Sequence, residues 1–487
     1  MDYIVGFVSI SLVALLYFLL FKPKHTNLPP SPPAWPIVGH LPDLISKNSP
    51  PFLDYMSNIA QKYGPLIHLK FGLHSSIFAS TKEAAMEVLQ TNDKVLSGRQ
   101  PLPCFRIKPH IDYSILWSDS NSYWKKGRKI LHTEIFSQKM LQAQEKNRER
   151  VAGNLVNFIM TKVGDVVELR SWLFGCALNV LGHVVFSNDV FEYSDQSDEV
   201  GMDKLIHGML MTGGDFDVAS YFPVLARFDL HGLKRKMDEQ FKLLIKIWEG
   251  EVLARRANRN PEPKDMLDVL IANDFNEHQI NAMFMETFGP GSDTNSNIIE
   301  WALAQLIKNP DKLAKLREEL DRVVGRSSTV KESHFSELPY LQACVKKTMR
   351  LYPPISIMIP HRCMEICQVM GYTIPKGMDV HVNAHAIGRD PKDWKDPLKF
   401  QPERFLDSDI EYNGKQFQFI PFGSGRRICP GRPLAVRIIP LVLASLVHAF
   451  GWELPDGVPN EKLDMEELFT LSLCMAKPLR VIPKVRI

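Results

Sequence analysis

The chain has 487 residues, 45% of them hydrophobic and 23% charged, a balance typical of a folded protein rather than a disordered one. Its net charge of +3 is small for this length and no long basic run occurs, so we expect no nucleic-acid partner. The 7 cysteines are odd in number and scattered, which argues against a disulfide framework and favours a reducing compartment.

The first predicted element is a membrane anchor. Residues 3–21 form an apolar run without a charge, which as a helix would be roughly 28 Å long, about one hydrocarbon thickness. A cleaved signal peptide would have a shorter apolar region with basic residues before it. Here Asp2 precedes the run and Lys22-Pro23-Lys24-His25 follows it. We therefore expect residues 1–24 to stay as an uncleaved single span with the basic end in the cytosol.

A proline-rich segment follows the predicted anchor. Residues 25–40 contain Leu28-Pro29-Pro30-Ser31-Pro32-Pro33-Ala34-Trp35-Pro36, which cannot be helical and should form stiff polyproline II. We expect this hinge to hold the body at a fixed angle to the bilayer. The length would allow two or three domains, but no linker interrupts residues 41–487, so a single large domain is predicted.

The body is predicted to be mainly α with a minor β-sheet region. Hydrophobic periodicity indicates long helices at 144–163, 233–256, 277–308 and 311–324. The strand-like stretches are short and lie at 66–71, 74–79, 369–372 and 380–383, with a hairpin built from 471–475 and 480–483. Proline and glycine recur throughout residues 391–433, which we interpret as a long ordered loop.

A polar interruption marks the longest predicted helix. Its middle is Phe288-Gly289-Pro290-Gly291-Ser292-Asp293-Thr294-Asn295-Ser296. Pro290 removes a helical hydrogen bond and clashes with the preceding turn, so we expect a kink that frees a carbonyl and opens space beside the helix. Asp293 and Thr294 form an adjacent acid–alcohol pair after this break. An ordinary helix break with an aspartate cap is the alternative.

A cysteine loop precedes the apolar run 434–450. It is Pro421-Phe422-Gly423-Ser424-Gly425-Arg426-Arg427-Ile428-Cys429-Pro430-Gly431. A thiolate on haem iron needs hydrogen-bond donors, a close backbone approach and cover from water. Gly425 and Gly431 would allow the approach, Phe422 would cover the sulfur, and Arg427 would pair with a haem propionate. The amino end of the following helix would stabilise the thiolate. A glycine-rich loop with a buried thiol is the alternative.

The spacing Phe422-x-x-Gly425-x-Arg427-x-Cys429-x-Gly431 resembles the signature of the cytochrome P-450 family at every fixed position, and the resemblance extends over the whole chain. It implies the cytochrome P-450 fold and a haem b whose iron is bound by Cys429. The implied haem contacts are Trp124, Arg128, Arg362, Phe422, Arg427 and Gly431. Trp124 and Arg128, four residues apart, would share one helix face. The resemblance also implies that Asp293 and Thr294 are catalytic, serving oxygen activation and proton delivery.

Two departures from the family pattern stand out. Pro290 replaces the usual Ala or Gly, and Asn295 replaces Thr or Ser, which argues against ordinary oxygen insertion. Lys347 stands where the family has a Glu that bridges Arg350 and Arg404, a structural trio. Breaking such a buried pair costs about 3–5 kcal/mol. We interpret Lys347 as a lesion or sequence variant, with compensation by Glu403 and a haem-deficient, inactive protein as open alternatives.

Within the family, the chain is similar to a plant group that acts on benzylisoquinoline alkaloids. The resemblance implies an oxidase that couples two N-methylcoclaurine-type units through a phenolic C–O bond with O2, and aromatic hydroxylation of one unit is the alternative. A haem carrier or gas sensor is a further class, but a thiolate ligand and an acid–alcohol pair favour an enzyme. The implied location is the endoplasmic reticulum membrane, with the catalytic domain in the cytosol.

No GxGxxG motif follows a strand, so electrons from NADPH must come from a partner, which the resemblance implies is NADPH-cytochrome P-450 reductase. Basic residues around the motifs could steer this acidic partner: Lys125, Lys126, Lys129, Arg426 and Arg437. The alternative for each of them is a solvated basic surface.

A bulky aromatic substrate requires an apolar pocket. By position we expect it to be lined from 105–117, 209–217, Met285, 355–359 and 471–473, with Phe105, Phe288, Pro290, Ile355 and Leu473 as substrate contacts. Asp215 or Asp217 could pair with the cationic amine of the substrate. A solvated turn after Gly213-Gly214 is the favoured alternative.

Overall fold

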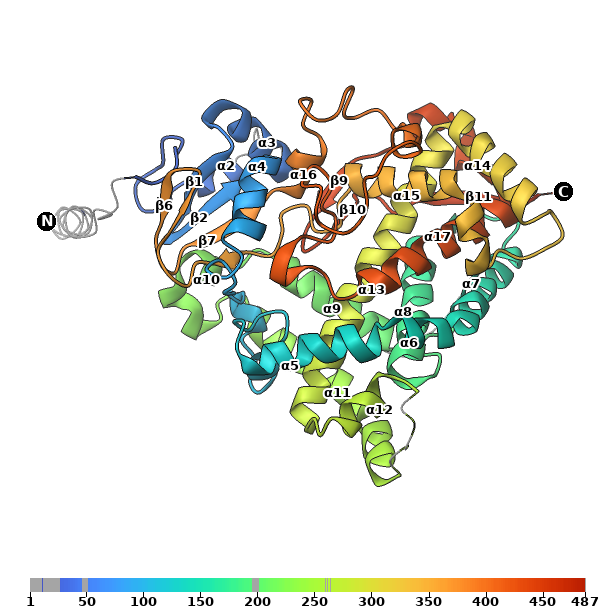
Figure 1. The fold of residues 1–487 in the computed structure, drawn as a ribbon, viewed down its shortest axis with the longest axis horizontal. Helices are drawn as coiled ribbons and strands as arrows, with labels where there is room; N and C mark the ends of the chain where they lie inside the picture. Colours follow the sequence, from blue (N-terminus) through green and yellow to red (C-terminus); the bar gives the residue numbers. More distant parts are fainter. Residues whose placement is uncertain are drawn as a thin grey trace, which may run out of the picture.

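The computed structural model describes residues 11, 27–45, 51–194, 201–258, 260, 262 and 264–486. The predicted anchor lies outside the described residues apart from Ser11. In the described part, helices make up most of the molecule and the strands form small sheets, with the four-stranded sheet at one end (Figure 1). This confirms the predicted fold class of a mainly α protein with a minor β-sheet region.

The central element is α13, Glu277–Lys308, drawn in yellow through the middle of the molecule (Figure 1). A capping box starts it, because the Asn276 and Gln279 side chains each accept a hydrogen bond from the backbone of the other. The helix runs on through Pro290 with its predicted bounds. It packs on α8 (Arg170–Phe186), α15 (Pro339–Leu351) and α17 (Arg432–Ala449).

The other helices surround this core. The predicted helices at 144–163, 233–256 and 311–324 are confirmed within a few residues at their ends. The surrounding helices are α2 (Leu41–Ile45), α3 (Phe52–Tyr63), α4 (Lys82–Met86), α5 (Ser122–Ile130), α6 (Gln138–Ala143), α7 (Glu145–Met160), α9 (Met202–Gly214), α10 (Val218–Tyr221), α11 (Leu233–Ala257), α12 (Met266–Ala272), α14 (Pro310–Val323) and α16 (Ala384–Gly388). In the described residues, α17 alone is long and apolar enough to cross a membrane, but most of it is buried in the core.

The largest sheet has the strand order β1-β2-β7-β4. β1 (Leu66–Phe71) and β2 (His74–Ala79) are antiparallel and have their predicted bounds. β7 (Asp379–Val382) runs parallel to β2, and β4 (His361–Arg362) is antiparallel to β7. The sheet therefore joins the beginning of the body to a segment about 300 residues further along the chain.

The strand predicted at 369–372 is wrong. β5 (Cys367–Val369) and β6 (Tyr372–Ile374) pair as an antiparallel hairpin, and the predicted strand covers its turn. Met370 and Gly371 have φ angles of 50° and 81°. Positive φ at both central residues is the geometry that two-residue hairpin turns require.

The hairpin predicted from 471–475 and 480–483 is also wrong. β10 (Leu473–Met475) pairs with β9 (Glu467–Phe469), which precedes it. β11 (Arg480–Val485) pairs instead with β3 (Val167–Glu168) and β8 (Phe450–Glu453). Alternating hydrophobicity identifies a strand but not its partner, and both partners of β11 lie outside the region that a local turn could connect.

The described part of the proline-rich segment lies against the body. The His68 N–H donates to Pro30 O at 2.9 Å, and the Asn27 side-chain amide donates to Gly371 O at 2.7 Å. These bonds join the segment to β1 and to the turn between β5 and β6. They give residues 27–30 a fixed position on the sheet end of the molecule.

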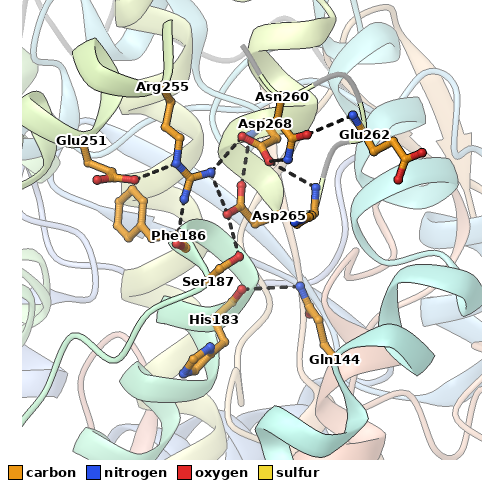
Figure 2. A network of polar contacts seen from close by, with 11 residues as sticks. Gln144, His183, Phe186, Ser187, Glu251, Arg255, Asn260, Glu262, Asp265 and Asp268 are labelled. Atoms are coloured by element: carbon orange, nitrogen blue, oxygen red, sulfur yellow. Dashed lines mark hydrogen bonds and ion pairs between the residues drawn. The ribbon is translucent and has the colours of Figure 1, made fainter. Parts of the chain in front are cut away.

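A buried polar network joins the ends of α8, α11 and α12 (Figure 2). The Arg255 guanidinium donates to Asp265 at 3.0 Å, to Asp268 at 2.8 Å and to Phe186 O at 3.0 Å. Asp265 also accepts from the Ser187 hydroxyl at 2.7 Å and caps α12. Charge-assisted bonds of this kind fix the corner at which the three helices meet.

Residues 391–431 form the predicted ordered loop, with only short 3₁₀ turns at Pro402–Phe405 and Gly425–Arg427 as helical structure. The loop ends at α17, which carries the cysteine segment onto the core helix α13.

Candidate haem site

Cys429 lies in the loop that leads into α17. Its N–H donates to Phe422 O at 2.9 Å, which closes the loop on itself. The Cys429 side chain is exposed, yet burial raises the pKa of the thiol, opposed by the Gly431 N–H and by Arg128. A sulfur that is deep in the protein but still has free surface lines an internal space. The donors and the cation beside it are those that stabilise a thiolate.

Gly425 and Gly431 of the loop differ in their protein contacts. Gly425 has a φ of +63°, and a Cβ there would lie 2.0 Å from the Leu89 carbonyl oxygen. Only glycine fits this contact, but the contact is with the chain itself. Gly431 has an ordinary φ of −77°, and its added Cβ would meet the Cys429 Sγ at 3.8 Å. The backbone angle at Gly431 therefore does not require glycine, and its close approach to the haem stays a prediction.

The predicted haem-binding side chains gather beside the loop. Arg427 donates to Ser97 O and Ser118 O, each at 2.6 Å, and Arg128 donates to Ile428 O at 2.6 Å. The Trp124 ring lies 4.6 Å from the Arg427 guanidinium and 5.7 Å from that of Arg128. Trp124 and Arg128 therefore share one face of α5, as their spacing predicts.

Two further arginines complete this group. Arg362, on β4, donates to both carboxylate oxygens of Asp119 at 2.7 and 2.9 Å. Arg99 is buried and donates to Ile359 O and Pro360 O, both at 2.8 Å. The sequence interpretation missed Arg99, because its partners lie about 260 residues away and no local pattern marks it.

The arginine group fits the two propionates of haem b. Burial, followed by the charge of Arg427, lowers the pKa of Arg99 to about 9, and burial lowers that of Arg427 to about 10. The Arg99 Nε has no hydrogen-bond partner among the described residues. Crowded, partly unsatisfied guanidinium groups favour carboxylates placed among them.

α13 carries Pro290 and Thr294. Pro290 is exposed and Thr294 half-buried, although α13 is the core helix. The Thr294 hydroxyl donates to Pro290 O at 2.7 Å. Asp293 has different partners from Thr294. Its carboxylate accepts from the Ser472 hydroxyl, which in turn accepts from the Asn297 amide at 3.0 Å. Burial raises the pKa of Asp293, against the Ser472 hydrogen bond.

The comparisons with known proteins agree with this geometry. The Cytochrome P-450 family profile matches residues 29–482. The chain belongs to the cytochrome P-450 family. A zebrafish cytochrome P-450 solved with progesterone has a TM-score of 0.78 at 26% identity, over 90% of this chain and 100% of that chain. The family consists of haem-thiolate enzymes, so this protein is an oxidoreductase that binds haem iron through an axial cysteine.

Curated relatives resemble the chain along its full length. Berbamunine synthase from Berberis stolonifera is 99% identical over 487 residues, 100% of both chains. Corytuberine synthase from Coptis japonica is 52% identical over 100% of both chains. A probable (S)-N-methylcoclaurine 3'-hydroxylase from Coptis japonica is 43% identical over 99% of this chain and 98% of its own length.

Lys347 is the departure from the cytochrome P-450 pattern that the structure makes most visible. It is fully buried on α15, and its Nζ has no hydrogen-bond partner in the part of the chain described. Burial, and then Arg350 and Arg404, lower the pKa of its amine to about 6. The Nε atoms of Arg350 and Arg404 are likewise without partners there.

Glu403 does not compensate for Lys347. One oxygen of its carboxylate accepts from Lys312 at 3.2 Å, from Lys315 at 3.4 Å and from the Tyr340 hydroxyl at 3.1 Å. Those groups belong to α14 and to the start of α15. No hydrogen bond or ion pair between Glu403 and Lys347 is found among the described residues.

Two of the expected substrate contacts, Phe288 and Leu473, have no exposed surface in the structure, so their contact with substrate stays a prediction. Phe288 is fully buried between the Phe186 and Trp248 rings, with centroid distances of 5.9 and 6.2 Å. Leu473 is fully buried in β10. Both side chains face the core. The sequence around each is apolar on both faces of its helix or strand, so only tertiary packing determines which face is buried.

The other expected contacts differ in exposure, and Phe105 is buried. Phe105 packs on Trp117 with a centroid distance of 5.5 Å and lies against Gly213, while Ile355 is half-buried. Asp215 is exposed at the end of α9. Asp217 caps α10 by accepting from the Ala219 N–H at 3.0 Å, which matches the alternative of a turn.

Proposed function

We propose that this cytochrome P-450 couples two N-methylcoclaurine-type benzylisoquinolines by forming a phenolic C–O bond, as in berbamunine formation. The observation that carries the proposal is the 99% identity to berbamunine synthase over the whole chain. The exposed Pro290 on α13 supports it, because proline occupies and stiffens the groove beside Thr294.

The reaction balances without insertion of oxygen into the product. Each of two phenols loses one hydrogen atom, and a C–O bond joins them. O2 is reduced to two waters by these two hydrogen atoms together with two electrons and two protons from NADPH and solvent. Haem with a thiolate ligand supplies the one-electron oxidising chemistry when bound.

The residues around the cysteine loop are proposed to hold the haem. Cys429 is the axial ligand in this proposal, and the N–H groups at the start of α17 moderate its charge. Arg128, Arg362 and Arg427, together with Trp124, hold the propionate edge of the haem, and Phe422 covers the sulfur side. Gly431 adds no side chain beside the sulfur.

Proton delivery is assigned to α13. Thr294 holds its hydroxyl on the accessible side of the helix, where it would donate a proton or a hydrogen bond during turnover. Asp293 accepts from Ser472, which accepts from Asn297, and burial raises the pKa of Asp293, which favours the protonated form that a proton donor needs.

The proposed partners are NADPH-cytochrome P-450 reductase and the endoplasmic reticulum membrane, with residues 1–24 as the anchor, residues 25–40 as the hinge and residues 41–487 as the cytosolic haem domain. Lys125 and Lys129 are exposed on α5, beside the cysteine loop, and Arg426 is exposed in the loop itself. Such a basic face can steer an acidic reductase to the side from which Cys429 is approached.

Aromatic hydroxylation of one alkaloid is a second candidate, since an N-methylcoclaurine 3'-hydroxylase is 43% identical. Coupling and hydroxylation give products of different mass. Purified protein with reductase, NADPH, ¹⁸O2 and N-methylcoclaurine should give a product of two substrate units minus two hydrogen atoms, without ¹⁸O. A single unit carrying one ¹⁸O would overturn coupling. Absence of product together with low haem content would indicate the inactive, haem-deficient protein instead.

A further inference from the structure

Glu286, on α13, makes a set of contacts that the proposed reaction has not used. Its Oε2 accepts from the Ile115 N–H at 2.8 Å and from the Leu116 N–H at 3.0 Å. The Ser114 hydroxyl donates to its Oε1. Hydrogen bonds to a carboxylate are stronger than those between neutral groups. One side chain therefore holds three consecutive residues that lie about 170 positions earlier in the chain.

The segment held in this way, residues 114–118, is neither helix nor strand, yet Ser114, Ile115 and Trp117 are buried and the other two residues are half-buried. Buried backbone groups need partners, and side chains provide them here. The Trp117 N–H donates to the Ser114 hydroxyl oxygen at 2.7 Å, and Arg427 donates to the carbonyls of Ile115 and Ser118. Glu286 satisfies the donors and Arg427 the acceptors, so the segment lies between α13 and the cysteine loop.

If residues 114–118 moved, the expected substrate pocket and the arginine group would both change position. Trp117 packs on Phe105 with a centroid distance of 5.5 Å. The Ile115 side chain lies so close to α5 that a Cβ on Gly127 would be 2.4 Å from its Cδ1. Gly127 is adjacent to Arg128. The position of residues 114–118 therefore sets where an aromatic wall of the pocket and one side of α5 stand.

We infer that Glu286 is a positioning residue, whose carboxylate fixes residues 114–118 between α13 and the cysteine loop and so sets the aromatic wall that receives the substrate. The substrate part of this inference rests on the proposed function. A planar aromatic ring is the ligand chemistry that a wall of Phe105 and Trp117 would take.

The charge state of Glu286 makes the contact dependent on pH. Burial raises the pKa of its carboxyl to about 7, against the hydrogen bonds from Ser114, Leu116 and Ile115 and the charge of Arg427. Tyr123 also faces it, and burial raises the pKa of that phenol, so it stays neutral. The pKa of Arg427, about 10, keeps the guanidinium charged. Protonation of Glu286 below neutrality removes an acceptor that faces backbone N–H groups.

Glu286→Gln tests the inference, with Glu319→Gln as its matched control. Glu319, on α14, also accepts from two consecutive backbone N–H groups, those of Tyr340 at 2.8 Å and Leu341 at 2.9 Å, but lies away from the haem site. In the haem-loaded proteins, amide hydrogen exchange of residues 114–118 should accelerate about tenfold in Glu286→Gln, as expected for the loss of a hydrogen bond to a charged group. It should stay unchanged in Glu319→Gln.

The functional readout is titration with N-methylcoclaurine, followed by the Soret absorption. Affinity in the parent should fall as the pH drops through about 7, and Glu286→Gln should show weaker binding without that pH dependence. If Glu286→Gln does not load haem, Ser114→Ala removes one donor to the same carboxylate and should shift both readouts in the same direction. Unchanged exchange and an unchanged pH profile would overturn the inference, as would equal changes in Glu319→Gln. Failure of the parent to bind this alkaloid would count against the proposed function alone, since hydrogen exchange reports on the segment directly.

Discussion

The surroundings of Lys347 do not suit a lysine amine. A buried amine with no partner lies beside two guanidinium groups whose Nε atoms also lack partners in the described residues. Burial lowers the pKa of Arg350 to about 9, as do Arg404 and Arg389. A carboxylate at this position would accept from both arginines, and a neutral or cationic lysine cannot.

We therefore predict that Lys347→Glu raises haem incorporation and the melting temperature. Breaking one partner of a buried ion pair costs about 3–5 kcal/mol, and restoring it should recover a similar amount. That gain would raise the melting temperature by several degrees. Haem per protein and melting curves, measured side by side, check this prediction.

The neighbouring Lys346→Glu is the matched control. Lys346 donates to Glu411 at 2.6 Å, so reversal of its charge should lower stability. Equal haem content and melting temperature in the parent and Lys347→Glu would show that the cluster is compensated and that Lys347 is not damage.

Cys429 is the residue on which haem ligation depends. We predict that Cys429→Ser abolishes the red-shifted Soret band that the family resemblance implies for the reduced carbon monoxide complex. A serine hydroxyl is a poor iron ligand compared with a thiolate. Cys344→Ser, at a buried thiol on α15 remote from the loop, should keep the band. Retention of the band in Cys429→Ser would mean that another residue binds the iron.

Thr294 is predicted to govern how efficiently electrons reach product. Thr294→Ala should lower the yield of product per NADPH and release more peroxide, because a proton donor on the accessible side of α13 is lost. Thr294→Ser, which keeps the hydroxyl, should behave like the parent. Unchanged coupling of NADPH to product in the alanine variant would indicate that Pro290 has rerouted proton delivery.

At the scale of elements, the region around α10 and the following 3₁₀ turn, Pro223–Phe228, exposes large apolar side chains. Val224, Phe228 and Leu230 are 63%, 56% and 60% exposed. The region is fixed on the sheet, because the Leu73 N–H donates to Tyr221 O at 2.9 Å. α10 lies near β2 and β7 at the sheet end of the molecule (Figure 1). Exposed apolar groups of this kind suit contact with a bilayer.

We predict that deletion of residues 1–24 releases the protein from membranes only in part. The apolar groups of the α10 region should keep a fraction bound without the anchor. Flotation with liposomes measures this fraction. The same truncation with Val224→Asp and Phe228→Asp should be soluble. If deletion of residues 1–24 alone made the protein fully soluble, the α10 region would not be a second membrane contact.

At the scale of the whole molecule, Lys347 should make stability depend on pH. Its pKa of about 6 in the folded protein lies below its ordinary value of 10.5, so the unfolded chain binds more protons between these values. Stability must therefore rise with pH across that window, by at most about 1.4 kcal/mol for each pH unit. Urea unfolding at pH 7 and pH 9 should show this rise in the parent but a smaller one in Lys347→Met. Equal pH dependence in both proteins would contradict the lowered pKa.

The sequence by itself determined the elements whose signals are local. The bounds of α13 follow from its apolar periodicity and from the cap at Asn276, and those of β1 and β2 from short alternating runs. The cysteine loop could be recognised because its residues act within a few positions of one another. Their spacing also placed Trp124 and Arg128 on one helix face.

The tertiary structure decided which distant groups meet. β11 pairs with β3 and β8 rather than with β10, since a strand pattern does not specify its partner. Packing buries Phe288 and leaves Pro290 exposed, although both lie on one apolar stretch of α13. Arg99 and Glu286 bind backbone groups about 260 and 171 positions away. Such contacts depend on the path of the whole chain, so no local pattern of residue types reveals them.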